Sequence, residues 1–213
     1  MFNAQIVSAH NAAAAAGRFV WFTASALAVV FFVHAAMRFL VITEASYKVF
    51  WVNRYALLAH FVGGSIALLA GIFQFWAGLR ERHPAVHRFT GRLYLAGGAP
   101  GAAAAFDMSF NSVVSWTFGV TGFTMASAWT ICTAMAFAAI RRRQVQAHRE
   151  WMIRGYVVLF GFVVFRALFA ELGTLQERLT AIMWLCWVAP LLVAEVVLQW
   201  RRTFGPLERK PPR

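Results

Sequence analysis

The chain alternates long apolar segments with short connections that carry most of its charged residues. Six apolar segments reach the length of about 20 residues that a helix needs to cross the hydrocarbon core of a bilayer. They cover approximately residues 19–42, 55–79, 84–106, 116–140, 151–172 and 179–200. This pattern predicts an all-α integral membrane protein. It predicts a single six-helix transmembrane bundle over residues 19–200, between an N-terminal segment (residues 1–18) and a basic tail (residues 201–213).

Prolines mark particular points in these segments. Pro100 and Pro190 lie inside the third and sixth segments, where the missing N–H predicts a bend. Pro84 stands where the third helix is expected to begin, a position at which the missing N–H costs nothing. On a helix that begins there, His83 and His87 would lie on one face, one turn apart.

Composition and charge agree with a membrane location. Hydrophobic residues make up 61% of the chain, more than in a soluble domain. The net charge is +12, and most arginines fall in the second and fourth connections and after the last segment. The positive-inside rule then predicts that both termini are cytoplasmic. A charge confined to one side predicts contact with anionic lipid headgroups at the inner face, with no nucleic-acid partner.

Familiar soluble-enzyme motifs are absent from the sequence. The two cysteines, Cys132 and Cys186, lie inside apolar segments and form neither a disulfide framework nor a CxxC metal motif. The sequence contains no GxGxxG motif and no P-loop. If the protein is a reductase, its electrons must therefore come from a small carrier or from another subunit.

Small residues recur at helical spacing beside polar ones in the second and third segments. The two stripes are His60, Gly64, Ala67, Gly71 and Gly78, and His87, Gly91, Tyr94, Gly98, Ala102 and Ala105. Small residues on one face let two helix backbones approach closely in a membrane. They also leave room for a flat cofactor beside a histidine. The stripes alone favour helix packing.

Titratable residues fall into two layers along the segments. His148 and Arg166 are five helical turns apart in the fifth segment, so they share a face at a separation of about 27 Å. By depth, the outer layer comprises His34, Arg38, His60 and Arg166, and the inner layer comprises His83, His87 and His148. Ionisable groups inside a membrane usually face a partner or a polar cavity. Two histidine layers suggest a transmembrane redox relay.

Three motifs resemble one bacterial membrane family. They are the runs HFVGGSIALLAGIFQF (residues 60–75), HRFTGRLY (residues 87–94) and HREWMIR (residues 148–154). In this order the motifs resemble those of the family known as domain of unknown function 2306. The resemblance covers residues 55–172 and does not include the first and last apolar segments. The resemblance implies a multi-pass protein of the bacterial cytoplasmic (inner) membrane and carries no particular activity. The family pattern includes the positions of His60, His87, Arg88, Arg92, Tyr94, His148, Arg154 and Arg166.

A more distant resemblance is to membrane cytochromes of the ferric-reductase and cytochrome b561 kind, which hold haem between histidines on different helices. It implies haem b bound by His87 with His148 at the inner face, and by His34 with His60 at the outer face. A quinone or another redox subunit would then exchange electrons with the protein. Arginines near the inner histidines are candidates for haem propionates or an anionic substrate: Arg88, Arg92, Arg149 and Arg154.

Two other classes of function stay open. His83, His87 and His148 could hold zinc with an open fourth position for water, as in a membrane hydrolase. Glu81 and Glu150 are the nearby candidates for its general base. Alternatively, the protein is a non-enzymatic assembly or scaffold subunit, in which the small residues and arginines serve packing and topology alone. Glu195 is expected to pair with an inner arginine rather than to carry protons.

Overall fold

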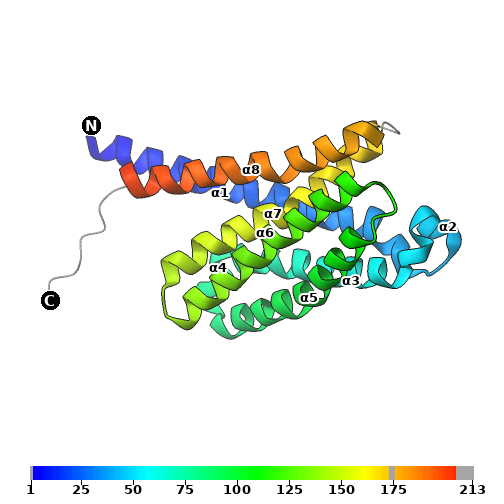
Figure 1. Cartoon of the computed structure of the whole chain (residues 1–213). Helices are drawn as coiled ribbons and strands as arrows, with labels where there is room; N and C mark the ends of the chain where they lie inside the picture. Colours follow the sequence, from blue (N-terminus) through cyan, green and yellow to red (C-terminus); the bar gives the residue numbers. More distant parts are fainter. Residues whose placement is uncertain (1, 173–175, 205–213) are drawn as a thin grey trace. The chain divides into compact units, whose positions relative to one another are not determined.

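The computed structural model describes residues 2–172 and 176–204, and these residues are helical apart from short connections, with no β-strand among them. The chain divides into two compact units, Met1–Phe123 and Thr124–Arg213. The boundary lies inside a long helix, α6 (Trp116–Arg141), which contributes to both units. Figure 1 shows the order of the helices along the chain. The all-α prediction is confirmed for the described residues.

The first unit begins with a long helix whose end changes pitch. Helix α1 (Phe2–Phe31) is followed by a π-helical turn, η1 (Phe32–Ala36), and a 3₁₀ turn, η2 (Met37–Leu40). The predicted start of the first apolar span near residue 19 agrees with the candidate span Gly17–His34, but the helix itself begins earlier, at Phe2. Polar residues interrupt the apolar pattern before residue 19, but alanine, which favours helix strongly, fills much of that stretch.

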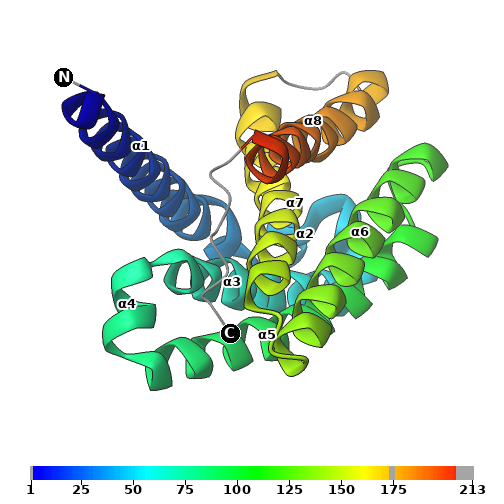
Figure 2. The ribbon, with the colours of Figure 1, turned by 90° about the vertical axis from the view of Figure 1, so that its left-hand side faces the viewer.

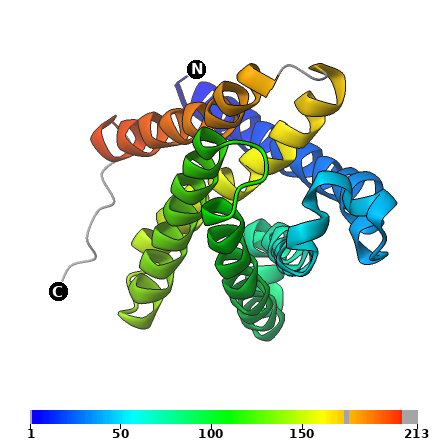
Figure 3. The same cartoon turned by 45° about the vertical axis from the view of Figure 1, so that its right-hand side comes forward.

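Two antiparallel helices form the core of the first unit. After a short helix α2 (Glu44–Tyr47) and a 3₁₀ segment η3 (Lys48–Asn53), α3 (Arg54–Phe75) packs along α5 (Pro84–Phe110). Figure 3 shows these two helices side by side. Their backbones nearly touch: a Cβ built on Gly63 would lie 2.4 Å from the carbonyl oxygen of Gly97. The predicted helix packing between these segments is therefore confirmed, and the positions where a Cβ would collide are Gly63, Gly97 and Gly101, whereas a Cβ on Gly64 would meet nothing within 4 Å.

A break at Trp76 divides the predicted second segment. Trp76 has an extended backbone conformation, and α4 (Ala77–Arg82) follows it as the corner between α3 and α5 (Figure 2). The indole N–H of Trp21 donates to the carbonyl of Ile72 at 3.1 Å, which satisfies one of the last carbonyls of α3 and ties α1 to it. Pro84 is the first residue of α5, as predicted, and α5 runs without interruption through Pro100.

The second unit contains the rest of α6 and two further helices, α7 (Val145–Leu172) and α8 (Gln176–Phe204), which pack against each other. Gly161 allows this approach, because a Cβ built on it would lie 2.7 Å from Cβ of Trp187. Helix α7 begins six residues before its predicted start at residue 151, so His148 is inside it. Pro190 lies within the continuous helix α8.

Several helices have the length and composition of membrane spans. Within the described residues these stretches are Gly17–His34, Glu44–Phe75, Trp116–Arg141 and Arg178–Phe204. Helices α5 and α7, with 27 and 28 residues, are about 40 Å long and also exceed the thickness of a hydrocarbon core. The chain is thus a membrane protein with several apolar helices, and the predicted count of six spans stays a prediction.

Candidate functional site

His60 is held against the neighbouring helix of its unit. It lies in the second turn of α3, and its Nδ1 is 3.0 Å from the carbonyl oxygen of Gly101 on α5. A carbonyl oxygen only accepts hydrogen bonds, so Nδ1 carries the proton and donates. In the neutral ring Nε2 then holds the lone pair. The contact depends on the glycine pairing of α3 and α5, because a Cβ on Gly101 would lie 3.0 Å from the Gly64 nitrogen.

His148 has the same arrangement in the second unit. It lies in the first turn of α7, and its Nδ1 is 2.9 Å from the carbonyl oxygen of Ala136 on α6. The same reasoning assigns the ring proton to Nδ1 and the lone pair to Nε2. Two histidines that are far apart in the chain therefore share one hydrogen-bonding pattern, in which Nδ1 is anchored to the backbone of an adjacent helix.

His87 lies in the first turn of α5, beside a glutamine that the sequence reasoning missed. Gln74, at the end of α3, is only 9% exposed. Its Nε2 donates to the carbonyl of His87 at 3.0 Å and to the hydroxyl of Thr90 at 2.6 Å. Gly91 leaves room for the amide, because a Cβ there would lie 3.2 Å from Oε1 of Gln74. The sequence signal that could have revealed Gln74 is its amide side chain inside an otherwise apolar run.

The other predicted histidines occupy less enclosed positions. His83 directly precedes α5, is exposed, and accepts a 3.1 Å backbone hydrogen bond from the N–H of His87, which confirms their one-turn spacing. His34 is exposed and lies in the π-helical turn η1, which contacts α3. The side chain of Arg38 lies outside the described residues.

The remaining members of the predicted cofactor set are spread over both units. Tyr94 is 1% exposed and belongs to the packed face of α5, whereas Arg88 and Arg92 are exposed on the same helix. Arg166 is half-buried on α7, the helix that also carries His148. His87 and His148 belong to different units, so their pairing stays a prediction, as does the zinc set of His83, His87 and His148.

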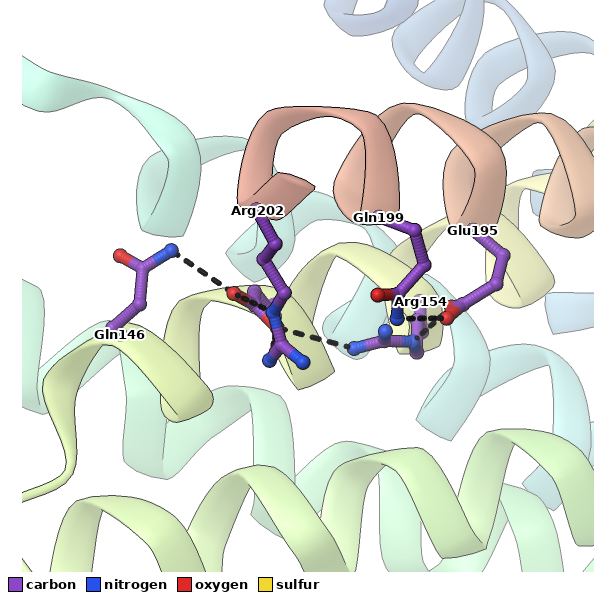
Figure 4. A network of polar contacts seen from close by, with 6 residues as sticks. Gln146, Arg154, Glu195, Gln199 and Arg202 are labelled. Carbon is purple, nitrogen blue, oxygen red and sulfur yellow. Dashed lines mark hydrogen bonds and ion pairs between the residues drawn. The ribbon is translucent and has the colours of Figure 1, made fainter. Parts of the chain in front are cut away.

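A charged network joins α7 to α8 in the second unit (Figure 4). Nε of Arg154 donates to Oε2 of Glu195 at 2.7 Å, and Nε2 of Gln199 donates to the other oxygen of Glu195 at 2.8 Å. The Arg154 guanidinium also lies 4.9 Å above the ring centre of Trp151. The ion-pair role predicted for Glu195 is therefore confirmed. Arg154, predicted to bind a cofactor or an anionic substrate, is engaged in this pair.

Glu150 is the buried member of the same network. It is 2% exposed, and its carboxylate accepts hydrogen bonds from Gln146 at 3.0 Å and from both Nε and Nη2 of Arg202. Nη1 of Arg154 lies 3.8 Å away, so Arg154 bridges the two carboxylates. Two arginines thus balance two glutamates. A carboxylate with these partners is poorly suited to act as the general base of a hydrolase.

Within the described residues of either unit, no three His, Cys, Asp or Glu side chains lie close enough together to hold a metal ion. The described residues of each unit therefore offer anchored histidines and, in the second unit, an ion-paired charge network. A haem with axial histidines needs one or two such side chains and no third protein ligand.

Comparison with known proteins identifies the family. A family described as "Predicted membrane protein (DUF2306)" matches residues 57–198. The match extends beyond the three motifs and includes most of α8, which the motif resemblance had left outside. No curated protein matches significantly, and neither does any solved structure. The matched region covers well over half of the chain, and the protein therefore belongs to the DUF2306 family of predicted membrane proteins.

Proposed function

We propose that this protein transfers electrons within the bacterial cytoplasmic membrane and holds haem b through its anchored histidines. The observation that carries the proposal is the hydrogen bond that His60 and His148 each make from Nδ1 to a carbonyl of an adjacent helix. Histidines that ligate a metal almost always donate their other ring N–H to a carbonyl, a carboxylate or water. This bond fixes the tautomer and the ring plane, and leaves the Nε2 lone pair as the ligating atom.

The donor set suits haem better than a bare metal ion. Neutral imidazoles are axial ligands of b-type haem, and the bound group supplies reversible one-electron chemistry. In the first unit, His60 and His34 are the proposed pair, because η1 contacts α3 and π-helical turns recur at functional sites. In the inner layer, His148 and His87 are the proposed pair. Gln74 holds the carbonyl of His87 and so fixes the backbone from which that ring projects.

The proposal includes an arrangement of the helices in the membrane. We propose that α5 and α7 cross the membrane together with the four apolar stretches, which gives one six-helix bundle with both termini in the cytoplasm. Histidine layers near both faces then suit electron transfer across the bilayer. The proposed electron partner is a membrane-soluble quinone or another redox subunit, because the sequence has no dinucleotide-binding motif.

Histidine variants of the full-length protein, produced in cells supplied with haem, test the proposal. The measured quantity is haem per polypeptide, determined in detergent by the pyridine haemochrome method. His60→Ala and His148→Ala are each expected to lose haem, while His83→Ala, at an exposed position before α5, keeps it. Correct folding of each variant is checked by circular dichroism and by gel filtration.

Two results would contradict the proposal. The first is a folded wild-type protein without haem, and the second is full haem content in both His60→Ala and His148→Ala. Metal analysis of the same samples separates the alternatives. Zinc in stoichiometric amount without haem would point to the hydrolase, and neither cofactor would point to the scaffold subunit.

A further inference from the structure

Helix α5 presents two different faces in its first three turns. The face toward α3 carries His87, Thr90, Gly91 and Tyr94, of which Tyr94 is buried and the others are half-buried. The opposite face carries Arg88, Phe89 and Arg92, which are all exposed. At about 100° per residue, Arg92 lies some 140° around the helix from His87. These two arginines therefore lie away from the face of α5 that packs on α3.

The exposed face combines positive charge with apolar side chains. Arg88 and Arg92 are one turn apart, so both guanidinium groups can reach one anion. Val86, Phe89 and Leu93 are exposed beside them, with 44%, 59% and 38% of their surface accessible. A free anion in water would gain nothing from these apolar neighbours. A lipid presents an anionic headgroup and acyl chains together.

The corner before α5 adds to the positive charge. Helix α4 ends with Arg80 and Arg82, and the only acidic residue nearby in the chain, Glu81, lies 3.7 Å from Arg80. Within the described part of the chain, no ion pair involves Arg82, Arg88 or Arg92. Trp76 is exposed at the break between α3 and α4, as expected of an aromatic residue at the membrane interface. Figure 2 shows this corner between α3 and α5.

We propose that this face is a binding site for an anionic phospholipid. Arg88 and Arg92 bind the headgroup phosphate, for which the planar guanidinium is well suited. Phe89 and Leu93 contact the acyl region below it. Arg82 adds charge from the end of α4. The site is independent of the haem proposal, because it uses the opposite face of α5.

Lipid titration of the full-length protein in neutral detergent tests this site. Binding of fluorescent phosphatidylglycerol is compared with binding of fluorescent phosphatidylcholine that has the same acyl chains. The test variant is Arg88→Gln/Arg92→Gln. The matched control is Arg141→Gln/Arg142→Gln, which removes the same charge from exposed positions at the end of α6. Each arginine that contacts the bound headgroup is expected to contribute about fivefold in affinity.

The expected result is a preference of the wild type for phosphatidylglycerol. This affinity should fall about 10- to 30-fold in the α5 variant and less than about threefold in the control. Arg88→Lys/Arg92→Lys, which keeps the charge and should fold like the wild type, is expected to lose about threefold because the bidentate contact is lost. Phe89→Ala should also weaken binding.

Three results would contradict the proposed phospholipid site. One is equal binding of the two lipids by the wild type, and another is an equal loss in the α5 variant and the control, which would indicate unspecific attraction. The third is complete competition by millimolar inorganic phosphate, which would identify a site for a free anion instead of a lipid.

Discussion

Arg154 and Glu195, 41 positions apart in the chain, form an ion pair with 2.7 Å between Nε and Oε2, and this contact joins α7 to α8. The arginine side chain is 12% exposed, whereas the glutamate side chain is 41% exposed. Glu195 can therefore be solvated without its partner more easily than Arg154. Arg154 therefore depends on this ion pair for compensation of its charge more than Glu195 does.

Glu195→Gln should lower the free energy of unfolding by about 1 kcal/mol, because the ion pair becomes a hydrogen bond from the charged guanidinium to a neutral amide and part of the site is exposed. Gln199→Leu, which removes the hydrogen bond from a neutral amide to the same carboxylate and leaves the ion pair in place, should cost less. Thermal unfolding in detergent, followed by circular dichroism, measures both. An equal or larger effect of Gln199→Leu would show that the ion pair is not the main contact.

The two sides of the Glu150–Arg202 pair should respond unequally. The Glu150 side chain is 3% exposed and that of Arg202 is 53% exposed. Arg202→Gln leaves a buried carboxylate with less compensation, and should cost about 2–3 kcal/mol. Glu150→Gln leaves an arginine that can reach water, and should cost less than Arg202→Gln. Denaturant unfolding of the two variants in the same detergent tests this order, and the reverse order would contradict it.

Two adjacent glycines provide a matched test of the packing between α3 and α5. A Cβ on Gly63 would lie 2.4 Å from the Gly97 carbonyl oxygen, whereas a Cβ on Gly64 meets nothing within 4 Å. Gly63→Ala should therefore destabilise the protein by about 2 kcal/mol or more, since two backbones must separate. Gly64→Ala should be neutral or slightly stabilising, because alanine favours helix. Similar unfolding temperatures for the two variants would disprove the observed register.

Removing the buried amide between the same helices gives a further prediction. Gln74→Leu keeps the volume but loses the hydrogen bonds to His87 and Thr90. It should cost about 0.5–1.5 kcal/mol, the usual range for a polar contact between membrane helices. If Gln74 also positions His87, the variant should shift the haem midpoint potential. An unaltered potential in a haem-containing Gln74→Leu protein would restrict Gln74 to a packing role.

The hydrophobic pattern, together with the positions of prolines and charged residues, was sufficient to predict much of the fold. The all-α class, the start of α5 at Pro84 and the limits of α6 within one residue follow from local chemistry. Glu195 was assigned an arginine partner because a carboxylate in an apolar helix requires compensation. Each of these features depends on a residue and its immediate neighbours in the chain.

Other features depend on tertiary packing and were predicted wrongly or missed. Gly63 and Gly64 are equally small, and only the contact with α5 determines which of them faces it. The apolar pattern placed the start of α7 at residue 151, but the helix extends from Val145 because polar residues continue a helix beyond its apolar part. Gln74 lies inside an apolar run, and its bond to the carbonyl of His87 is visible only in three dimensions.

The visible absorption spectrum of the detergent-purified protein, oxidised and then reduced with dithionite, tests the proposed electron-transfer function most directly. A haem-binding protein should show a Soret band that shifts and an α-band that sharpens on reduction, and both should be lost together in His60→Ala/His148→Ala. A folded protein that is colourless after expression with haem supplied would contradict the proposed function.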